Sequence, residues 1–218
     1  MTPDDFVVAV VDAYIASRAP IRLHEKLRRG ESRSIASETE DLLAYYLVSQ
    51  IPSIDRIFIN QPLTTNTGRR IKPDLVICRR SQITDFLDVK IDLGYKRKTF
   101  EVTLLQTDKR MGELRGQTFD ISAHNGTNRE RSAFSLAHNA RYHFVIISDR
   151  NVSQAIFRGF EKRASSLSNV AFHVLTRSCH PNENHWPKDT IMKNIEICHQ
   201  AFKNLELEIQ RVFAEQDG

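Results

Sequence analysis

The sequence predicts an α/β sandwich built around a mixed β-sheet. The first observation is the order of periodic segments: helix, three strands, helix, strand, helix and strand. The second is length, because 218 residues with 40% hydrophobic side chains can bury one good core. We therefore expect one domain over residues 1–218, with its core at about 36–176, an N-terminal helix at 3–17 and a C-terminal helix at about 189–214.

Two helices precede the predicted strands. Residues 3–17 carry apolar side chains at helical spacing. The segment SETEDLLAYYLVSQI, residues 37–51, has the same spacing and ends before Pro52. It opens with Ser37, and Glu40 follows three residues later, which is the signature of a capping box. The sequence thus predicts a second helix that begins at Ser37.

Residues 56–92 predict a three-stranded antiparallel meander. Its strands are RIFINQPL, IKPDLVICRR and ITDFLDVKID, which are rich in β-branched and aromatic residues. The turn-like stretch TTNTGRR separates the first strand from the second. Short polar connections of this kind favour pairing between consecutive strands.

The second half of the chain alternates between helical and strand-like segments. In order, the patterns predict a helix at about 98–115, a polar loop in FDISAHNGTNRER (119–131), a short helix at 130–139, a buried strand at 141–149, a helix at 152–167 and a last strand at 170–176.

The C-terminal segment shows apolar residues at alternating three- and four-residue steps. They are Ile191, Ile195, Cys198, Phe202, Leu205, Ile209 and Val212. This heptad-like seam is typical of a helix that packs on its own core or of one that pairs with a second copy. Both interpretations stay open at this point.

Composition limits the partners and the compartment. Lys and Arg exceed Asp and Glu by four, and the pI is about 9.0, so a polyanionic partner is allowed but not required. No apolar run approaches the roughly 18 residues of a membrane span, and the N-terminus MTPDDFVVAV is acidic, unlike a signal peptide. We expect a soluble cytoplasmic protein without a membrane partner, and three cysteines without paired spacing agree with a reducing compartment.

A zinc site is a minor alternative near the C-terminus. Its candidate ligands are Cys179, His180, His185, Cys198 and His199. Structural zinc sites usually show a CxxC-type spacing, which this region lacks. Packed or exposed side chains are the favoured interpretation.

Three charged residues interrupt the second and third predicted strands. Alternation along a strand puts Asp74 on one face with Val76, and it puts Asp88 with Lys90. If the strands are neighbours, both carboxylates and the ammonium converge on one patch of the sheet. Two ionised carboxylates repel unless a cation lies between them, and oxygen ligands favour Mg²⁺, for which Mn²⁺ can substitute.

A third acid is expected from the preceding helix. Glu40 lies one turn from the apolar stripe that faces the sheet, so its side chain can reach the edge of the patch. Glu38 shares a stripe with Leu42 and would serve nearly as well, and Asp41 also competes. The helix acid is therefore a choice, with Glu40 preferred and Glu38 as the alternative.

The half-motifs KPDLV and LDVK, about fourteen residues apart and preceded by an acid-bearing helix, resemble the PD-(D/E)XK nuclease superfamily. The likeness covers roughly residues 36–150. It implies a restriction-endonuclease-like three-layer sandwich with a central mixed sheet, an α-β-β-β-α-β core and extra terminal helices.

The resemblance also implies an activity: a Mg²⁺-dependent DNA endonuclease, of restriction or defence type, with no small-molecule substrate. Asp74, Asp88, Glu40 and the carbonyl of Val89 would hold the metal, and Lys90 would hydrogen-bond the attacking water. A homodimer would suit cleavage of both strands, since a two-fold protein matches a two-fold DNA site. The alternatives are a structure-selective repair or recombination nuclease, and a DNA-binding or assembly module that does not cut.

Basic and polar residues near the motifs are candidate DNA contacts. They are Arg69, Arg70, Lys72, Lys96, Arg97, Lys98, Asn128, Arg129 and Arg131. Such side chains bind phosphates and base edges, but each also fits a solvated loop.

Overall fold

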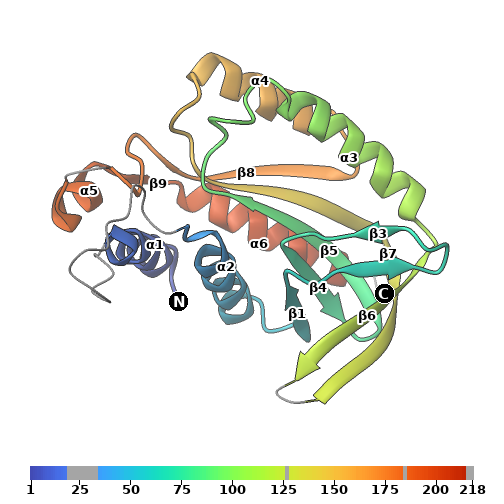
Figure 1. Ribbon diagram of the computed structural model, residues 1–218. Helices are drawn as coiled ribbons and strands as arrows, with labels where there is room; N and C mark the ends of the chain where they lie inside the picture. The colour runs from blue at the N-terminus through green and yellow to red at the C-terminus, as the bar shows by residue number, and fades with distance from the viewer. Residues whose placement is uncertain (19–33, 126–127, 184–185, 215–218) are drawn as a thin grey trace, which may run out of the picture.

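A computed structural model describes residues 1–18, 34–125, 128–183 and 186–214. Six helices and nine strands lie in these ranges (Figure 1). The helices are α1 (Pro3–Arg18), α2 (Ala36–Gln50), α3 (Phe100–Leu114), α4 (Gln154–Ser165), α5 (Lys188–Asn194) and α6 (His199–Ala214). The strands are β1 (Arg56–Ile59), β2 (Leu63–Thr65), β3 (Arg70–Ile71), β4 (Leu75–Arg79), β5 (Gln82–Lys90), β6 (Thr118–Asn125), β7 (Asn128–Ser148), β8 (Val170–Arg177) and β9 (Glu196–Ile197).

The described strands form one mixed sheet. Strands β1, β4 and β5 pair antiparallel, as the sequence predicts for its meander. β5 then pairs in parallel with β7, and β7 in parallel with β8, because α3 and α4 supply the crossovers. The long β7 also pairs with β6, whose other side carries β2. The fold class is therefore α/β with a mixed sheet.

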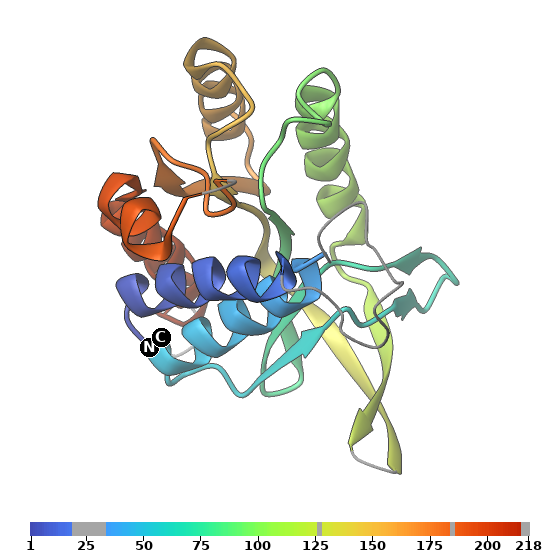
Figure 2. The same cartoon turned by 60° about the vertical axis from the view of Figure 1, so that its left-hand side comes forward.

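Helices cover both faces of the sheet. Side chains alternate along the strands, so Leu75 and Leu87 contact the core under α1, α2 and α6. Val76 and Phe86 point the other way, to the side that α3 covers. Figures 1 and 2 show α3 and α4 on one side of the sheet and α1 and α2 on the other, which is consistent with a three-layer sandwich.

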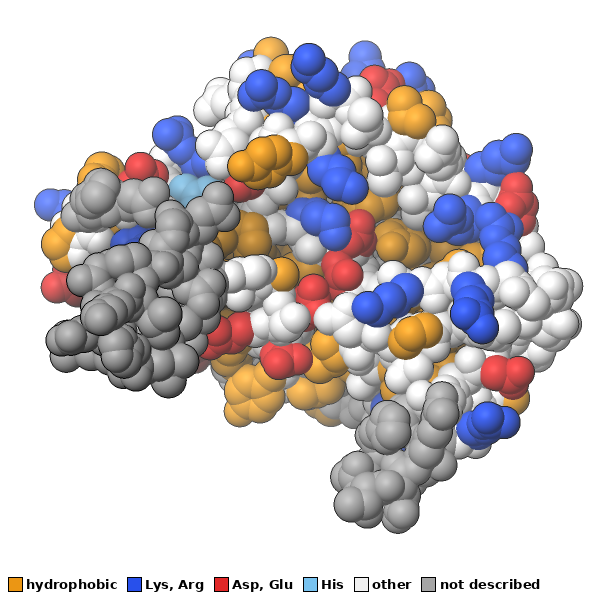
Figure 3. Space-filling model, viewed as in Figure 1, with side chains coloured by type: hydrophobic (Ala, Val, Ile, Leu, Met, Phe, Trp, Pro, Cys, Tyr) orange, Lys and Arg blue, Asp and Glu red, His pale blue; other side chains and the backbone are white. Residues whose placement is uncertain are grey.

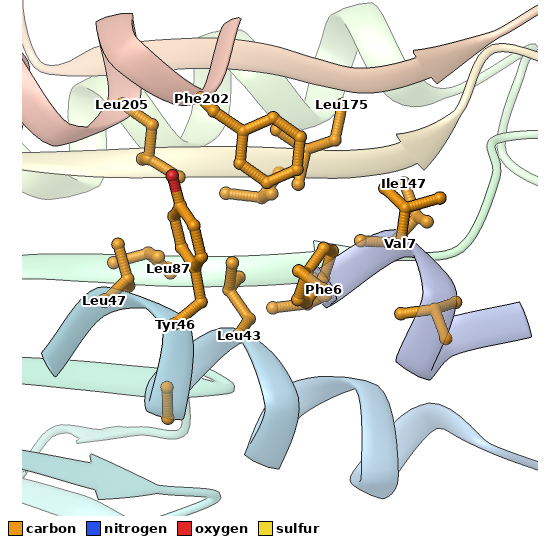
Figure 4. Packing of buried hydrophobic residues seen from close by; sticks show 14 of the residues in the cluster. Phe6, Val7, Leu43, Tyr46, Leu47, Leu87, Ile147, Leu175, Phe202 and Leu205 are labelled. Carbon is orange, nitrogen blue, oxygen red and sulfur yellow. The ribbon is translucent and has the colours of Figure 1, made fainter. Parts of the chain in front are cut away.

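The largest core lies between the sheet and the helices α1, α2 and α6. Figure 4 shows Phe6, Tyr46 and Phe202 meeting there, with ring centroids 5.1–5.9 Å apart. All three side chains are fully buried. Tilted and edge-on ring contacts add to the burial of apolar area, so this cluster is what fixes α6 on the sheet.

The predicted loop at 119–131 and the predicted short helix at 130–139 are wrong. Both stretches belong to the long antiparallel hairpin of β6 and β7. Phe119 and Phe134 are cross-strand partners and are buried. At the start of β6, the exposed Asp120 separates the buried Phe119 and Ile121, and such polar residues between apolar ones made the strand resemble a loop.

The predicted C-terminal helix at about 189–214 is interrupted. α5 ends at Asn194, and β9 then pairs with β8, so α6 starts only at His199. The apolar run spans two helices rather than one seam. Ile191, Ile195, Phe202, Leu205 and Ile209 are buried in the core of their own chain, which supports the core-packing interpretation.

Two element boundaries also differ from the prediction. The first strand ends at Ile59, because Asn60 takes a left-handed conformation with φ of 53°, and Leu63–Thr65 forms a separate strand that pairs with β3 and β6. Helix α2 begins at Ala36 with Ile35 as its N-cap, so Ser37 does not cap it. In the described part of the chain, no helix combines the length and the apolar character needed to cross a membrane.

We expect Phe202→Ala to lower the free energy of unfolding by about 3–5 kcal/mol, because it empties the centre of the ring cluster. Leu207→Ala on the same helix is the matched control, since Leu207 is 51% exposed, and its effect should stay within about 0.5 kcal/mol. Urea unfolding followed by circular dichroism measures both. Equal effects of the two substitutions would contradict the core-packing role of α6.

Candidate metal-binding site

The start of β4 and the end of β5 bring Asp74 and Asp88 together. Leu75 pairs with Leu87, and continuing this antiparallel register by one residue sets Asp74 opposite Asp88. The backbone of Asp74 is held from both sides: its N–H donates to the carbonyl of Leu87 at 3.0 Å, and its carbonyl accepts the N–H of Asn60 at 2.7 Å. The sheet itself therefore positions this carboxylate.

Lys90 closes the group. Its Nζ lies 3.3 Å from Oδ2 of Asp74, donates to the carboxylate of Asp88 and lies 3.3 Å from the carbonyl oxygen of Val89. The N–H of Val89 donates to Oδ2 of Asp74 at 2.7 Å. The structure thus brings together the two acids, the lysine and the Val89 carbonyl that the sequence nominated.

The two carboxylates differ in acidity. Burial and hydrogen bonding with Asp74 raise the pKa of Asp88 to about 7. Burial also opposes ionisation of Asp74, but hydrogen bonding with Asp88 and the charge of Lys90 outweigh it and lower the pKa of Asp74. Burial likewise acts against the charge on Lys90, yet the two carboxylates raise its pKa. At neutral pH, Asp74 is ionised and Asp88 is divided between its two forms.

Glu40 is the acid of α2 that reaches the site. Its carboxylate accepts a hydrogen bond from the side-chain amide of Asn60 rather than forming a capping box. Glu40 is 7% exposed, and its pKa is raised by burial and then by Asp74. Glu38 and Asp41 on the same helix are exposed. Geometry therefore favours Glu40 over the alternative Glu38.

Glu40 stands at the edge of the site rather than at its centre. Among the described residues, the ligand atoms of Glu40, Asp74 and Asp88 do not all lie within 4.8 Å of one another. Asp74 and Asp88 are thus the closer pair of candidate ligands.

Asn60, Tyr142 and Arg110 are neighbours of the site that the sequence did not reveal. Asn60 bonds both Glu40 and the backbone of Asp74. Tyr142 is influenced by both aspartates, since burial and then their charges raise its pKa. Tyr142 and Arg110 line a cavity of about 50 Å³ next to Pro73, together with Lys72. The sequence-level signal that fits Asn60 is an Asn directly after the strand residues RIFI, because Asn tolerates the left-handed conformation that ends the strand.

The candidate DNA contacts fall into three places. Lys72 lines the cavity together with Pro73, and the exposed Arg69 and Arg70 are close by in sequence, although Arg69 pairs with Glu113 at 2.7 Å. Lys96, Arg97 and Lys98 are exposed in the turn that leads into α3. Asn128, Arg129 and Arg131 belong to the projecting β6–β7 hairpin, away from the acids (Figures 1 and 2).

One face of the molecule carries both signs of charge. Figure 3 shows acidic side chains near the middle of this face and Lys and Arg side chains above and beside them.

The minor zinc alternative does not form a cluster in the described residues. His180 bonds Asp92, with 3.2 Å between Nε2 and Oδ2, and His199 bonds Asp4 at 2.9 Å. Cys179 is buried, Cys198 is half-buried, and His185 lies outside the described residues.

No protein-family model, curated protein or solved structure matches the chain. The meaning of the site therefore rests on its own geometry and chemistry.

We expect Asp88→Asn to stabilise the metal-free protein at pH 8 by about 1–3 kcal/mol and to have little effect at pH 4. The folded-state pKa of Asp88 is raised to about 7, so its contribution to stability is present below about pH 4 and is lost progressively as the pH rises from there to 7. The side-chain amide of the Asp88→Asn variant does not ionise, so the variant does not lose stability in this way. Thermal unfolding in EDTA across this pH range measures the difference, and a variant less stable than wild type at pH 8 would contradict the assignment.

Proposed function

We propose that this protein is a Mg²⁺-dependent DNA endonuclease. The observation that carries the proposal is that Asp74, Asp88 and Lys90 lie together on paired strands. In this group the pKa of Asp88 is raised to about 7. Such an arrangement is costly for a fold that uses it only for stability, because buried like charges repel. It is useful where a cation and a phosphate must be held together.

The order of elements supports a restriction-endonuclease-like fold for this proposal. Helix α2, the antiparallel strands β1, β4 and β5, helix α3 and the parallel strand β7 follow one another as the α-β-β-β-α-β core requires. The hairpin of β2 and β3, the β6 strand and the helices α1, α5 and α6 are additions to that core. The motif residues occupy the middle of this core.

The donor set fits a hard divalent cation. Asp74 and Asp88 supply carboxylate oxygens, Val89 supplies its carbonyl, and Glu40 supplies a carboxylate at the edge. Burial and then Asp74 raise the pKa of Asp88 although Lys90 lowers it, and a cation would favour the ionised form. When bound, Mg²⁺ would supply charge stabilisation for phosphodiester hydrolysis and acidify water.

Lys90 and Glu40 have distinct roles in this proposal. The ammonium of Lys90 spans both aspartates, so it is placed to donate hydrogen bonds to a water molecule and to the phosphate oxygens. Glu40, held by Asn60, would accept a proton from water at the edge of the site. Both side chains are held by the fold before any substrate arrives, which is the condition for electrostatic preorganisation.

The loss of cleavage tests this assignment. We expect Asp74→Asn, Asp88→Asn and Lys90→Ala each to lower the rate of DNA cleavage in Mg²⁺ at least about 100-fold, because each removes a group that binds the metal or stabilises the transition state. Glu40→Gln should lower it as well, whereas Glu38→Gln is the matched control on the exposed face of α2 and should not. Plasmid cleavage in Mg²⁺, Mn²⁺, Ca²⁺ and EDTA measures the rates.

The substrate panel separates the competing functions. Discrete plasmid fragments would favour an enzyme of restriction or defence type, whereas cleavage of branched or flapped DNA alone would favour a structure-selective nuclease. Binding without cleavage in any metal would sink the enzyme proposal and leave a DNA-binding module. Sedimentation of the complex with DNA tests whether two copies act together.

Lys72 and Arg110 line the cavity next to Pro73, the residue that precedes Asp74, and in this proposal they hold the DNA backbone. In an Asp88→Asn background, we expect Lys72→Ala and Arg110→Ala to weaken DNA binding on all sequences and to reduce the salt dependence by about one counterion each. Lys203→Ala, an exposed change of equal charge on α6, is the control and should have little effect. Fluorescence anisotropy at several salt concentrations gives the slopes, and unchanged slopes would contradict the placement.

A further inference from the structure

A chain of buried polar side chains lies on the opposite face of the sheet from the acids. Asp85 shares the face of Leu87 on β5, which α6 covers, and His143 and His173 come from β7 and β8. Asp85 and His143 have no exposed surface, and His173 is 4% exposed. Glu208 reaches the group from α6, and its side chain is 32% exposed. Side chains from β5, β7, β8 and α6 thus form one polar cluster within an apolar layer.

The contacts lead from Asp85 to His143, and from His143 to His173 and Glu208. Nε2 of His143 lies 2.9 Å from Oδ1 of Asp85, and Nδ1 of the same ring lies 3.1 Å from Nε2 of His173. Nδ1 of His143 is also 4.0 Å from Oε2 of Glu208. The ligand atoms of His143, His173 and Glu208 all lie within 4.8 Å of one another.

Asp85 orients the ring of His143. It bonds the outer nitrogen Nε2, so the other ring nitrogen, Nδ1, is the one that faces His173 and Glu208. A carboxylate that bonds the outer nitrogen of an imidazole is the support that metal-binding histidines commonly have.

We propose that His143, His173 and Glu208 bind a transition-metal cation of the Zn²⁺ class. Two imidazoles and one carboxylate are a donor set that this class prefers, and Mg²⁺ does not. Bonds of about 2.0 Å in a tetrahedron separate neighbouring ligand atoms by about 3.3 Å. The observed 3.1 Å already matches this spacing, and the 4.0 Å closes with a small movement of the partly exposed Glu208. The same exposure leaves room for water as a fourth ligand.

Hydrogen bonds alone leave this cluster incomplete. Oδ2 of Asp85 and Nε of Arg141 are buried and have no hydrogen-bond partner among the described residues. Arg141 donates to Oε2 of Glu208 at 2.8 Å and to the carbonyl of Val170 at 2.6 Å. It therefore holds Oε2 of Glu208, the same oxygen that lies 4.0 Å from Nδ1 of His143, beside the two rings, so a cation would share this carboxylate with Arg141.

The role of this ion would be structural. It would link α6 to β5, β7 and β8 on the face away from Asp74 and Asp88, so it takes no part in the proposed cleavage. A site that forms only in the folded chain adds its binding free energy to stability. The inference does not depend on the proposed function, because different residues on different faces carry the two.

The test is Zn²⁺ binding by the full chain, stripped with a chelator and titrated against a competing indicator dye. We expect one equivalent to bind, at least tenfold weaker binding in His173→Gln and in Glu208→Gln, and a higher unfolding temperature in Zn²⁺ that a chelator reverses. His138→Gln removes an exposed histidine and Asp74→Asn removes an acid of the other face, so both should bind like wild type.

Three outcomes would overturn the proposal: no stoichiometric binding, binding that both His173→Gln and Glu208→Gln leave unchanged, or loss of binding in His138→Gln or Asp74→Asn instead. Glu208→Gln keeps the test valid if His173→Gln fails to fold, because Glu208 is partly exposed and circular dichroism can confirm its fold. Cleavage by the zinc-free protein in Mg²⁺ reports on the nuclease separately, so the two proposals fail independently.

Discussion

The register between β4 and β5 is the constraint on which the rest of the molecule depends. Leu75 faces Leu87 across the pair, and both are buried under α2 and α6. A shift of one residue would turn these side chains to the opposite face, so the apolar core fixes the register strongly. The same register sets Asp74 opposite Asp88. The acids are therefore held in place by the burial of their apolar neighbours rather than by their own interactions.

The electrostatic interaction between the two acids is unfavourable in this arrangement. Two carboxylates at neighbouring positions repel, and burial adds a desolvation cost that Lys90 relieves only in part. The core supplies the free energy that keeps them together, since the ring cluster of Phe6, Tyr46 and Phe202 anchors the helices on that sheet. The proposed cation would turn an unfavourable contact in the free protein into a binding site.

The sequence predicts well those features that follow from local periodicity. Alternation and the expected pairing of the two strands put Asp74, Asp88 and Lys90 together, and the meander of β1, β4 and β5 followed from short apolar runs. Features that depend on pairing between segments far apart in the sequence were not predicted. The start of β6 buries only the alternate residues Phe119 and Ile121, and β9 interrupts the C-terminal helices because β8 offers it an edge.

Glu40 and Asn60 show why a complete site is harder to predict than its centre. The spacing of Ser37 and Glu40 gave Glu40 a second explanation as a capping residue, and only the position of Asn60 in space decides between them. The buried polar chain is harder still, because single histidines in apolar strands such as RYHFVIISD resemble ordinary core residues. Nothing local links Asp85, His143 and His173, which three different strands contribute.

The two polar clusters are separated by strand geometry. Asp85 and Asp88 are three residues apart on β5, so their side chains point to opposite faces of the sheet, and the core under α6 lies on one side only. Oxygen ligands on one face and imidazoles on the other prefer different ions. A Mg²⁺ ion and a Zn²⁺ ion would therefore sort between the faces by ligand chemistry, and the strand that joins the two sites keeps them from sharing a ligand.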